Sequence, residues 1–162
     1  MTTLLIAGAA FVVMEPVTAL THRLVMHGFG MGWHRSHHEP PRGVVEANDL
    51  FPVVFSAATI VLLAVGVYGG GGEVLVPLGI GITAYGASYL FVHDLVIHRR
   101  LSRWLPLPAG FLAWHREAHN VHHLYSQAPY GFLAPVVPRA LRQRAGGAGI
   151  VRTDRSEAAL TR

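Results

Sequence analysis

The 162-residue chain contains no cysteine and no lysine. Without cysteine it cannot form disulfides, thiolate nucleophiles, cysteine-type zinc sites or an iron–sulfur cluster of its own. Charged residues are also scarce, at 14%, whereas a soluble domain carries about a quarter. Hydrophobic residues make up 51% of the chain and the mean hydropathy is +0.37, which argues against disorder. Eleven histidines outnumber nine carboxylates, so the composition predicts a histidine-rich, single-domain membrane protein.

The positive charges are unevenly placed. All thirteen basic residues are arginine; Arg23, Arg35 and Arg42 lie in one stretch, and the other ten lie between residues 99 and 162. A net charge of +4 and a pI near 10.1 would suit nucleic acid, but the arginines form no stripe interleaved with aromatic residues. They border apolar segments instead, a distribution typical of the cytoplasmic side of a membrane protein.

Three apolar segments are long enough to cross a bilayer. They run over residues 4–20, 51–68 and 74–92, and about 18–20 helical residues match a hydrocarbon layer about 30 Å thick. The first contains Glu15 and Pro16 and lacks a basic leader, so a membrane span is favoured over a signal peptide. The sequence therefore predicts an all-α, integral membrane helical bundle.

Three crossings would bring residues 22–50 and 93–162 to one face together with every arginine, and we expect that face to be cytoplasmic. Pro77 leaves an alternative, in which the third segment is two short helices and the two halves of the histidine set lie on opposite sides. The stretch from Leu124 to Pro138 contains three prolines and is too broken to span, so we expect it to be interfacial or re-entrant. We predict a membrane-embedded domain over residues 1–138 and a mobile cytoplasmic tail over residues 139–162.

Ten of the eleven histidines form four motifs with two repeated spacings, HX4H and HX2HH. The motifs are His22 and His27; His34, His37 and His38; His93 and His98; and His119, His122 and His123. On a helix, positions i, i+3 and i+4 fan over about 100° of one face. Each triplet can therefore face one polar pocket, and its adjacent pair can point to two centres.

The i, i+5 pairs are about 140° apart on an ideal helix. They need a helix end or a local distortion to share one ion, or they bind different ions. Ten imidazoles exceed the coordination capacity of a single ion, so the spacing predicts two metal ions. Imidazole suits zinc, copper, iron and nickel, and an all-nitrogen site beside an apolar reservoir favours oxygen activation by iron. The absence of any Glu-x-x-His sequence excludes the four-helix di-iron carboxylate proteins.

Two further residues accompany the motifs. Asp94 lies next to His93 and is expected either to accept a hydrogen bond from a metal-bound imidazole or to pair with Arg99 or Arg100. His115 lies one turn before the last motif, and we expect it to support a ligand or relay protons rather than to bind metal.

The four motifs resemble those of the membrane fatty acid hydroxylase superfamily, specifically its β-carotene 3-hydroxylase branch. The runs Ala118-His-Asn-Val-His-His123 and Pro129-Tyr-Gly-Phe132 are similar to the corresponding stretches of that branch. The resemblance implies a non-haem di-iron enzyme that uses O2 and two external electrons to hydroxylate β-carotene at C3, giving β-cryptoxanthin and zeaxanthin. It implies that the ten motif histidines bind two iron ions in a cytoplasmic site. The di-metal centre itself would be catalytic, without a separate acid or base.

Three alternatives share parts of this pattern. A related hydroxylase or ketolase acting on a fatty acid, a sterol or another carotenoid would use the same histidines. A membrane zinc peptidase needs His-Glu-x-x-His, but Glu117 stands at the wrong position between His115 and His119. A membrane metal carrier or sensor would favour a loose histidine tract over four spaced motifs.

The substrate is expected to enter from the bilayer, and electrons must come from outside the chain. Without cysteine or a dinucleotide-binding motif, the chain cannot hold an electron relay of the usual kinds. We therefore predict a ferredoxin or similar donor, which Arg99, Arg100, Arg103 and Arg116 would attract. The same arginines could equally serve membrane topology and contact with lipid headgroups.

Overall fold

The computed structural model describes residues 1–40, 43–100, 108, 110 and 112–147, and within this part of the chain all regular structure is helical. In chain order the elements are α1 (Thr2–Thr21), η1 (His22–Phe29), α2 (Met31–His38), η2 (Ala47–Asp49), α3 (Leu50–Tyr68), α4 (Gly72–Tyr89), η3 (Leu90–Ile97), α5 (Ala113–Tyr125) and α6 (Arg139–Gly147). Here η1 and η3 are π-helices that continue α1 and α4, and η2 is a short 3₁₀ turn.

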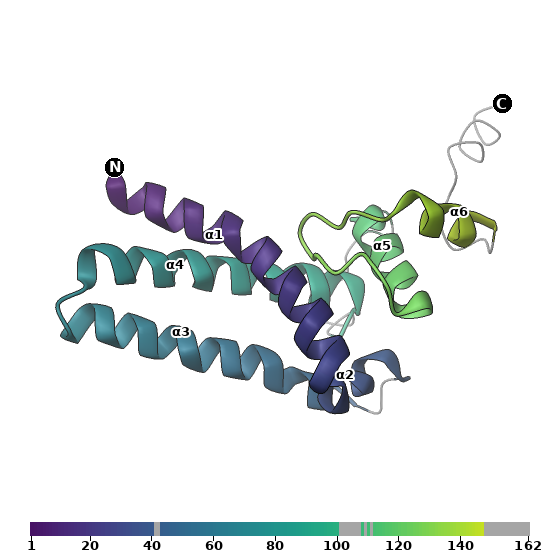
Figure 1. Cartoon of the computed structure of the whole chain (residues 1–162), viewed down its shortest axis with the longest axis horizontal. Helices are drawn as coiled ribbons and strands as arrows, with labels where there is room; N and C mark the ends of the chain where they lie inside the picture. Colours follow the sequence, from purple (N-terminus) through teal and green to yellow (C-terminus); the bar gives the residue numbers. More distant parts are fainter. Residues whose placement is uncertain (41–42, 101–107, 109, 111, 148–162) are drawn as a thin grey trace.

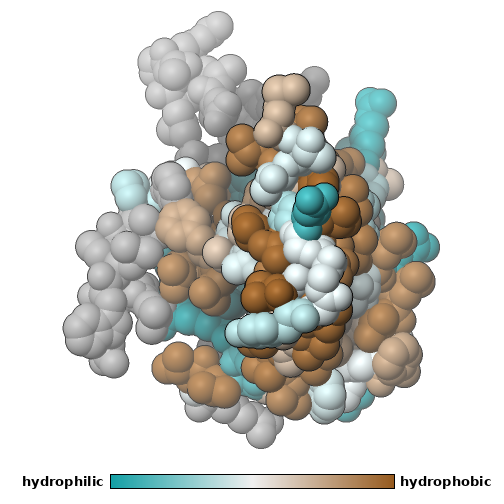
Figure 2. Space-filling view, turned by 90° about the vertical axis from the view of Figure 1, so that its left-hand side faces the viewer, coloured by the Kyte–Doolittle hydropathy of each residue, from teal (hydrophilic) through white to brown (hydrophobic). Residues whose placement is uncertain are grey.

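Three helices are long and apolar enough to cross a membrane: Thr2–Phe29, Ala47–Tyr68 and Gly72–Ile97. Their apolar side chains point outward, as with Leu4, which is 79% exposed, and Ile60, which is 66% exposed. Viewed from the end where α3 turns into α4, hydrophobic residues lie on several sides of the helices (Figure 2). Such surfaces are stable only in lipid, so the prediction of an all-α membrane protein with three apolar spans is confirmed.

Helix α4 lies between α1 and α3 and packs against both (Figure 1). Small residues permit the close approach. At Gly81, a side chain would overlap the Ala7 carbonyl oxygen and the Ala10 methyl group of α1. At Gly79, a side chain would overlap Leu63 of α3. Close packing at small residues is the usual way in which helices associate within a bilayer.

Pro77 lies inside α4 without breaking it, so the alternative of two short helices does not apply. Proline removes one backbone hydrogen bond, a loss that membrane helices tolerate. With three spans, the N-terminus and the α3–α4 turn lie at one end of the molecule, while α2 and α5 lie at the other (Figure 1). All four histidine motifs therefore meet at a single end.

Residues 126–138 follow α5 without regular secondary structure, in agreement with a stretch too broken to span. Residues 139–147, which the sequence analysis placed in the tail, form α6. Leu141 and Ala145 of α6 are buried against Ala118 and Val121 of α5, because the helix is apolar on the face that meets α5. Residues 148–162 lie outside the described residues, and the domain division at residue 138 stays a prediction.

Candidate metal centre

Nine of the ten motif histidines form two groups at the end of the molecule opposite the α3–α4 turn. The first group comprises His22 and His27 of η1, His34 and His38 of α2, and His122 of α5. The second comprises His37 of α2, His93 of η3, His98 immediately after η3, and His119 of α5. Within each group the side-chain nitrogens all lie within 4.8 Å of one another.

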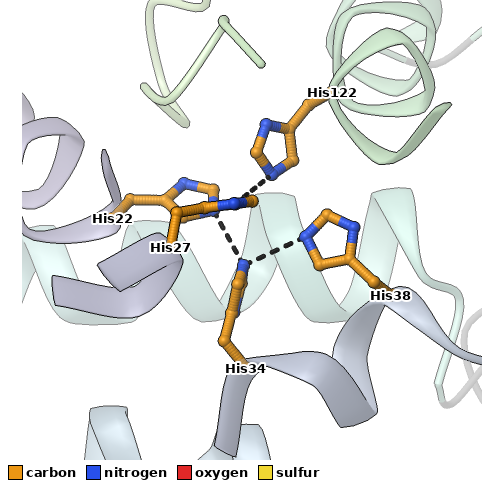
Figure 3. A group of neighbouring side chains, drawn as sticks. All are labelled: His22, His27, His34, His38 and His122. Atoms are coloured by element: carbon orange, nitrogen blue, oxygen red, sulfur yellow. Dashed lines mark hydrogen bonds between the residues drawn. The ribbon is translucent and has the colours of Figure 1, made fainter. Parts of the chain in front are cut away.

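In the first group the Nε2 atoms face one another (Figure 3). The Nε2 atom of His34 lies 3.1 Å from that of His22 and 3.1 Å from that of His38. The Nε2 atoms of His27 and His122 are also 3.1 Å apart. Two imidazole nitrogens about 2.1 Å from one ion, at tetrahedral or octahedral angles, would lie about 3.0–3.4 Å apart. The spacing of this group fits a shared transition-metal ion.

The second group has the same spacing. The Nε2 atom of His37 lies 3.2 Å from that of His93 and 3.4 Å from that of His119, which is 2.9 Å from the Nε2 atom of His98. His123 lies beside this group, with its Nε2 atom 2.8 Å from that of His119, and its ring also stacks on His38 of the first group. Two neighbouring groups of five and four imidazoles, with His123 next to both, fit two ions of a metal that prefers nitrogen ligands.

Local helix geometry explains how each HX4H pair joins one group. The backbone N–H of His98 donates to the carbonyl of His93, five residues earlier, and Gly30 N–H bonds Val25 in the same way. A π-helical turn closes bonds between residues five apart, so side chains at i and i+5 lie on one face. The local distortion required by the spacing is therefore present in both η1 and η3.

Each HX2HH motif is divided between the groups. In α2, His34 and His38 belong to the first group and His37 to the second. In α5, His122 belongs to the first group, whereas His119 belongs to the second. Adjacent residues on an α-helix point about 100° apart, so one short helix reaches two neighbouring centres.

Three outer nitrogens of the first group face oxygen atoms that carry no formal charge. His34 Nδ1 lies 2.7 Å from the Asn48 side-chain oxygen. His22 Nδ1 lies 3.1 Å from the Tyr130 carbonyl oxygen, and His122 Nδ1 lies 2.6 Å from the Gln127 carbonyl oxygen. An Nδ1–H that donates outward leaves the Nε2 lone pair directed into the group, as a metal ligand requires.

Carboxylates face the outer Nδ1 atoms of two histidines in the second group. Asp94 lies 2.9 Å from His93 Nδ1, and Glu46 lies 3.2 Å from His37 Nδ1. The Arg100 guanidinium lies 3.0 Å from Glu46 and 3.6 Å from Asp94. Asp94 therefore contacts both an imidazole and Arg100, and its role toward a bound metal stays a prediction. Glu46 and Asn48 could not be found from the sequence, because an outer partner on a connecting segment has no spacing that identifies it.

Burial favours the neutral form of His98 and of the motif histidines on α2 and α5. Burial, together with neighbouring imidazoles, lowers the pKa of His34 to about 4 and the pKa values of His98 and His122 to about 3. The pKa values of His37 and His119 are lowered even more, again mainly by burial. Neutral imidazole is the form that binds metal, so at pH 7 no proton has to be displaced.

His115 belongs to neither group. Its Nε2 atom lies 3.0 Å from the Leu133 carbonyl oxygen, so it contacts the segment after α5 rather than a motif histidine. A polar cavity of about 460 Å³ opens beside the second group, and its walls include Glu39, Asn120 and His123. This cavity provides access to the second group from outside the apolar spans.

Comparison with known proteins places these features in a family. The sequence profile described as fatty acid hydroxylase matches residues 7–142. A β-carotene hydroxylase of Pseudescherichia vulneris is 45% identical over 123 residues, which are 74% of this chain and 66% of that protein. A β-carotene hydroxylase of Pantoea ananas is 41% identical over 154 residues, covering 88% of this chain and 85% of that protein. A chloroplastic β-carotene 3-hydroxylase of Haematococcus lacustris is 36% identical over 83% of this chain, but over only 44% of its own length.

No solved structure matches the chain. The family profile covers every element that carries a motif histidine, from η1 to α5. Both the sequence match and the membrane helices with their histidine clusters support the same conclusion: the chain belongs to the fatty acid hydroxylase family.

Proposed function

We propose that this protein hydroxylates β-carotene at C3 of its β-ionone rings, giving β-cryptoxanthin and then zeaxanthin. The observation that carries the proposal is the pair of histidine groups at one end of three membrane helices. The names of its bacterial and chloroplastic relatives indicate the substrate. A ring C–H bond is unactivated, so no side-chain acid or base could break it, and a redox metal has to supply the oxidant.

The ten motif histidines would hold two iron ions, with five imidazoles available to each ion. His115 would bind neither ion. The bound ions would activate O2 with two electrons from an external donor and so supply the oxidant for hydroxylation. The chain's own contribution is to direct Nε2 atoms toward the ions and to enclose part of the site with aromatic rings. Phe132 is only 5% exposed and stacks on His22, with ring centroids 5.2 Å apart, while Tyr89 stacks on His93 at 4.7 Å. These rings form an apolar boundary of the site.

The bilayer supplies the substrate in this proposal. A long hydrocarbon is poorly soluble in water, and entry from lipid along the apolar spans avoids that transfer. Water and protons would instead approach through the cavity beside His98 and His123, and the electron donor would dock outside it. The two approaches would keep the hydrocarbon and the reductant apart.

A ferredoxin or similar acidic protein is the proposed electron donor. Arg99 lines the polar cavity and could attract such a partner. Arg100 is less available, because it lies against Glu46, Asp49 and Asp94. Arg103 lies outside the described residues. The concentration of arginine at this end also supports placing the metal centre on the cytoplasmic side of the cytoplasmic membrane.

Expression in a bacterial host that accumulates β-carotene tests the proposal directly. Pigment analysis should detect β-cryptoxanthin and zeaxanthin, and the purified protein should contain close to two irons per chain. The variants His37→Ala and His122→Ala, one in each group, should lose both iron and hydroxylation. Iron-loaded protein that leaves β-carotene unchanged, or forms only keto-carotenoids, in a host with a competent electron donor would contradict the substrate assignment. Stoichiometric zinc without oxygen consumption would contradict the chemistry.

A further inference from the structure

Glu15 is the one acidic residue within the first membrane span, and the proposed reaction assigns it no role. We infer that Glu15 is a positioning residue that fastens the closing loop, residues 127–134, against α1 and thereby sets the orientation of two histidines in the first group. The inference uses the proposed metal site but requires neither a particular substrate nor a particular electron donor.

The carboxylate of Glu15 accepts hydrogen bonds from three consecutive backbone N–H groups of the closing loop. Oε1 accepts from Phe132 at 3.0 Å and from Ala134 at 3.0 Å, while Oε2 accepts from Leu133 at 3.1 Å. These partners are more than a hundred positions apart in the chain. Three charge-assisted bonds to successive amides hold a segment that has no regular secondary structure to stabilise it.

The Glu15 carboxylate has further hydrogen-bond partners, which fix its position within the span. The Tyr85 hydroxyl of α4 donates to Oε2 at 2.6 Å, and Tyr85 is only 2% exposed. Thr18 Oγ1 in turn lies 2.7 Å from the Tyr85 hydroxyl. At Gly131, an added side chain would come within 2.5 Å of Glu15 Oε1, so the absence of a side chain leaves room for the carboxylate. A carboxylate within a membrane span is costly unless such partners compensate it.

The closing loop supplies the outer partners of two histidines. The Tyr130 carbonyl accepts from His22 Nδ1, and the Gln127 carbonyl accepts from His122 Nδ1. Phe132, whose N–H is held by Glu15, stacks on the His22 ring at an interplanar angle of 8°. Carbonyls at these positions fix the tautomer that directs Nε2 inward. Release of the loop would free both rings to rotate or to change tautomer.

Hydrogen exchange and metal spectroscopy test this inference on the full chain in detergent micelles, with Co²⁺ as the probe metal. In Glu15→Gln one oxygen becomes an NH2 group, which cannot accept a hydrogen bond. We expect exchange of the amides of residues 132–134 to accelerate about tenfold or more. We also expect a changed Co²⁺ ligand-field spectrum and affinity about tenfold weaker, because outer partners typically contribute about 10–100-fold. Tyr85→Phe, which removes one of four donors to the carboxylate, should show smaller changes in the same direction.

The matched control is Glu73→Gln, which removes an exposed carboxylate near the α3–α4 turn and should leave every measurement unchanged. If Glu15→Gln does not fold, Tyr85→Phe and Gly131→Ala still test the inference, since both disturb the same contact while keeping the carboxylate. Unchanged amide exchange at 132–134 would overturn it. Faster exchange with an unaltered Co²⁺ spectrum and affinity would also overturn it, because Glu15 would then act on the loop alone. None of these measurements depends on carotenoid turnover, so their failure is distinguishable from failure of the proposed function.

Discussion

At the scale of single residues, the two histidine groups differ in the charge of the oxygen atoms that face their outer Nδ1 atoms. Neutral oxygens of Tyr130, Asn48 and Gln127 face the first group. The carboxylates of Glu46 and Asp94 face the second. An anionic acceptor makes an imidazole more basic and therefore a stronger ligand. We expect the second group to bind metal more tightly than the first.

The variant Asp94→Asn should weaken metal binding at the second group by about 10–100-fold, because the amide keeps the shape of the side chain but removes its charge. Competition between the purified protein and a chelator of known affinity measures the change, with Glu73→Gln as the control. Equal affinity in Asp94→Asn and the unmodified protein would show that the charge of Asp94 does not act on the ligand.

At the scale of secondary-structure elements, the ends of α1 and α4 determine how the motifs work. Both helices become π-helical where they reach the histidines, which brings His22 together with His27 and His93 together with His98. The crossing of α1 over α4 brings both of these helix ends to the same end of the molecule (Figure 1). That crossing depends on the close contact between Gly81 of α4 and Ala7 of α1.

Gly81→Ala should destabilise the protein by about 1–3 kcal/mol, because the added methyl group has no room at the crossing. Gly86→Ala in the same helix is the control, since nothing lies within 4 Å of the position that its side chain would take. Alanine at Gly86 should be neutral or stabilising by up to about 1 kcal/mol. Thermal unfolding in detergent compares the two, and equal melting temperatures would argue against a tight α1–α4 contact.

At the scale of the whole molecule, the metal centre joins segments that are distant in the chain. The first group alone draws on η1, α2 and α5. A ligand that binds only the folded state stabilises it, by about 2.7 kcal/mol at a free concentration of 100 times Kd.

Metal removal should therefore lower the melting temperature, and re-addition of Fe²⁺ without oxygen should restore it. Differential scanning fluorimetry with and without chelator measures both steps, and His37→Ala should show a smaller response than the unmodified chain. A melting temperature that is insensitive to chelation would be inconsistent with metal bridging of the helices.

Membrane sidedness can be tested because the chain has no cysteine. In intact cells, a membrane-impermeant maleimide should label Thr2→Cys and Glu73→Cys. It should label Arg35→Cys and Gln143→Cys only after the membrane is opened, because three spans separate the two ends. All four parent positions are exposed. The reverse labelling pattern would place the metal centre outside the cytoplasm.

Much of the fold could be predicted from local composition. A run of apolar residues must be covered by lipid or protein, so the three spans and their common histidine-bearing end follow from length and spacing. The HX4H spacing required a helix end or a local distortion if each pair was to share one ion, and η1 and η3 provide the distortion. It could not show whether each pair shares one centre, because that depends on backbone bonds such as the one from His98 N–H to the His93 carbonyl.

The sequence by itself determined the membrane class and the residue types available for a metal, since these depend only on which side chains are present and at what spacing. Only the tertiary structure decided which histidines share a group and which oxygens stand behind them. It also gave Glu15 a set of partners, because its contacts with residues 132–134 join segments more than a hundred positions apart. Such contacts depend on how α1 packs against the closing loop. A local sequence pattern cannot predict a contact between residues so far apart in the chain.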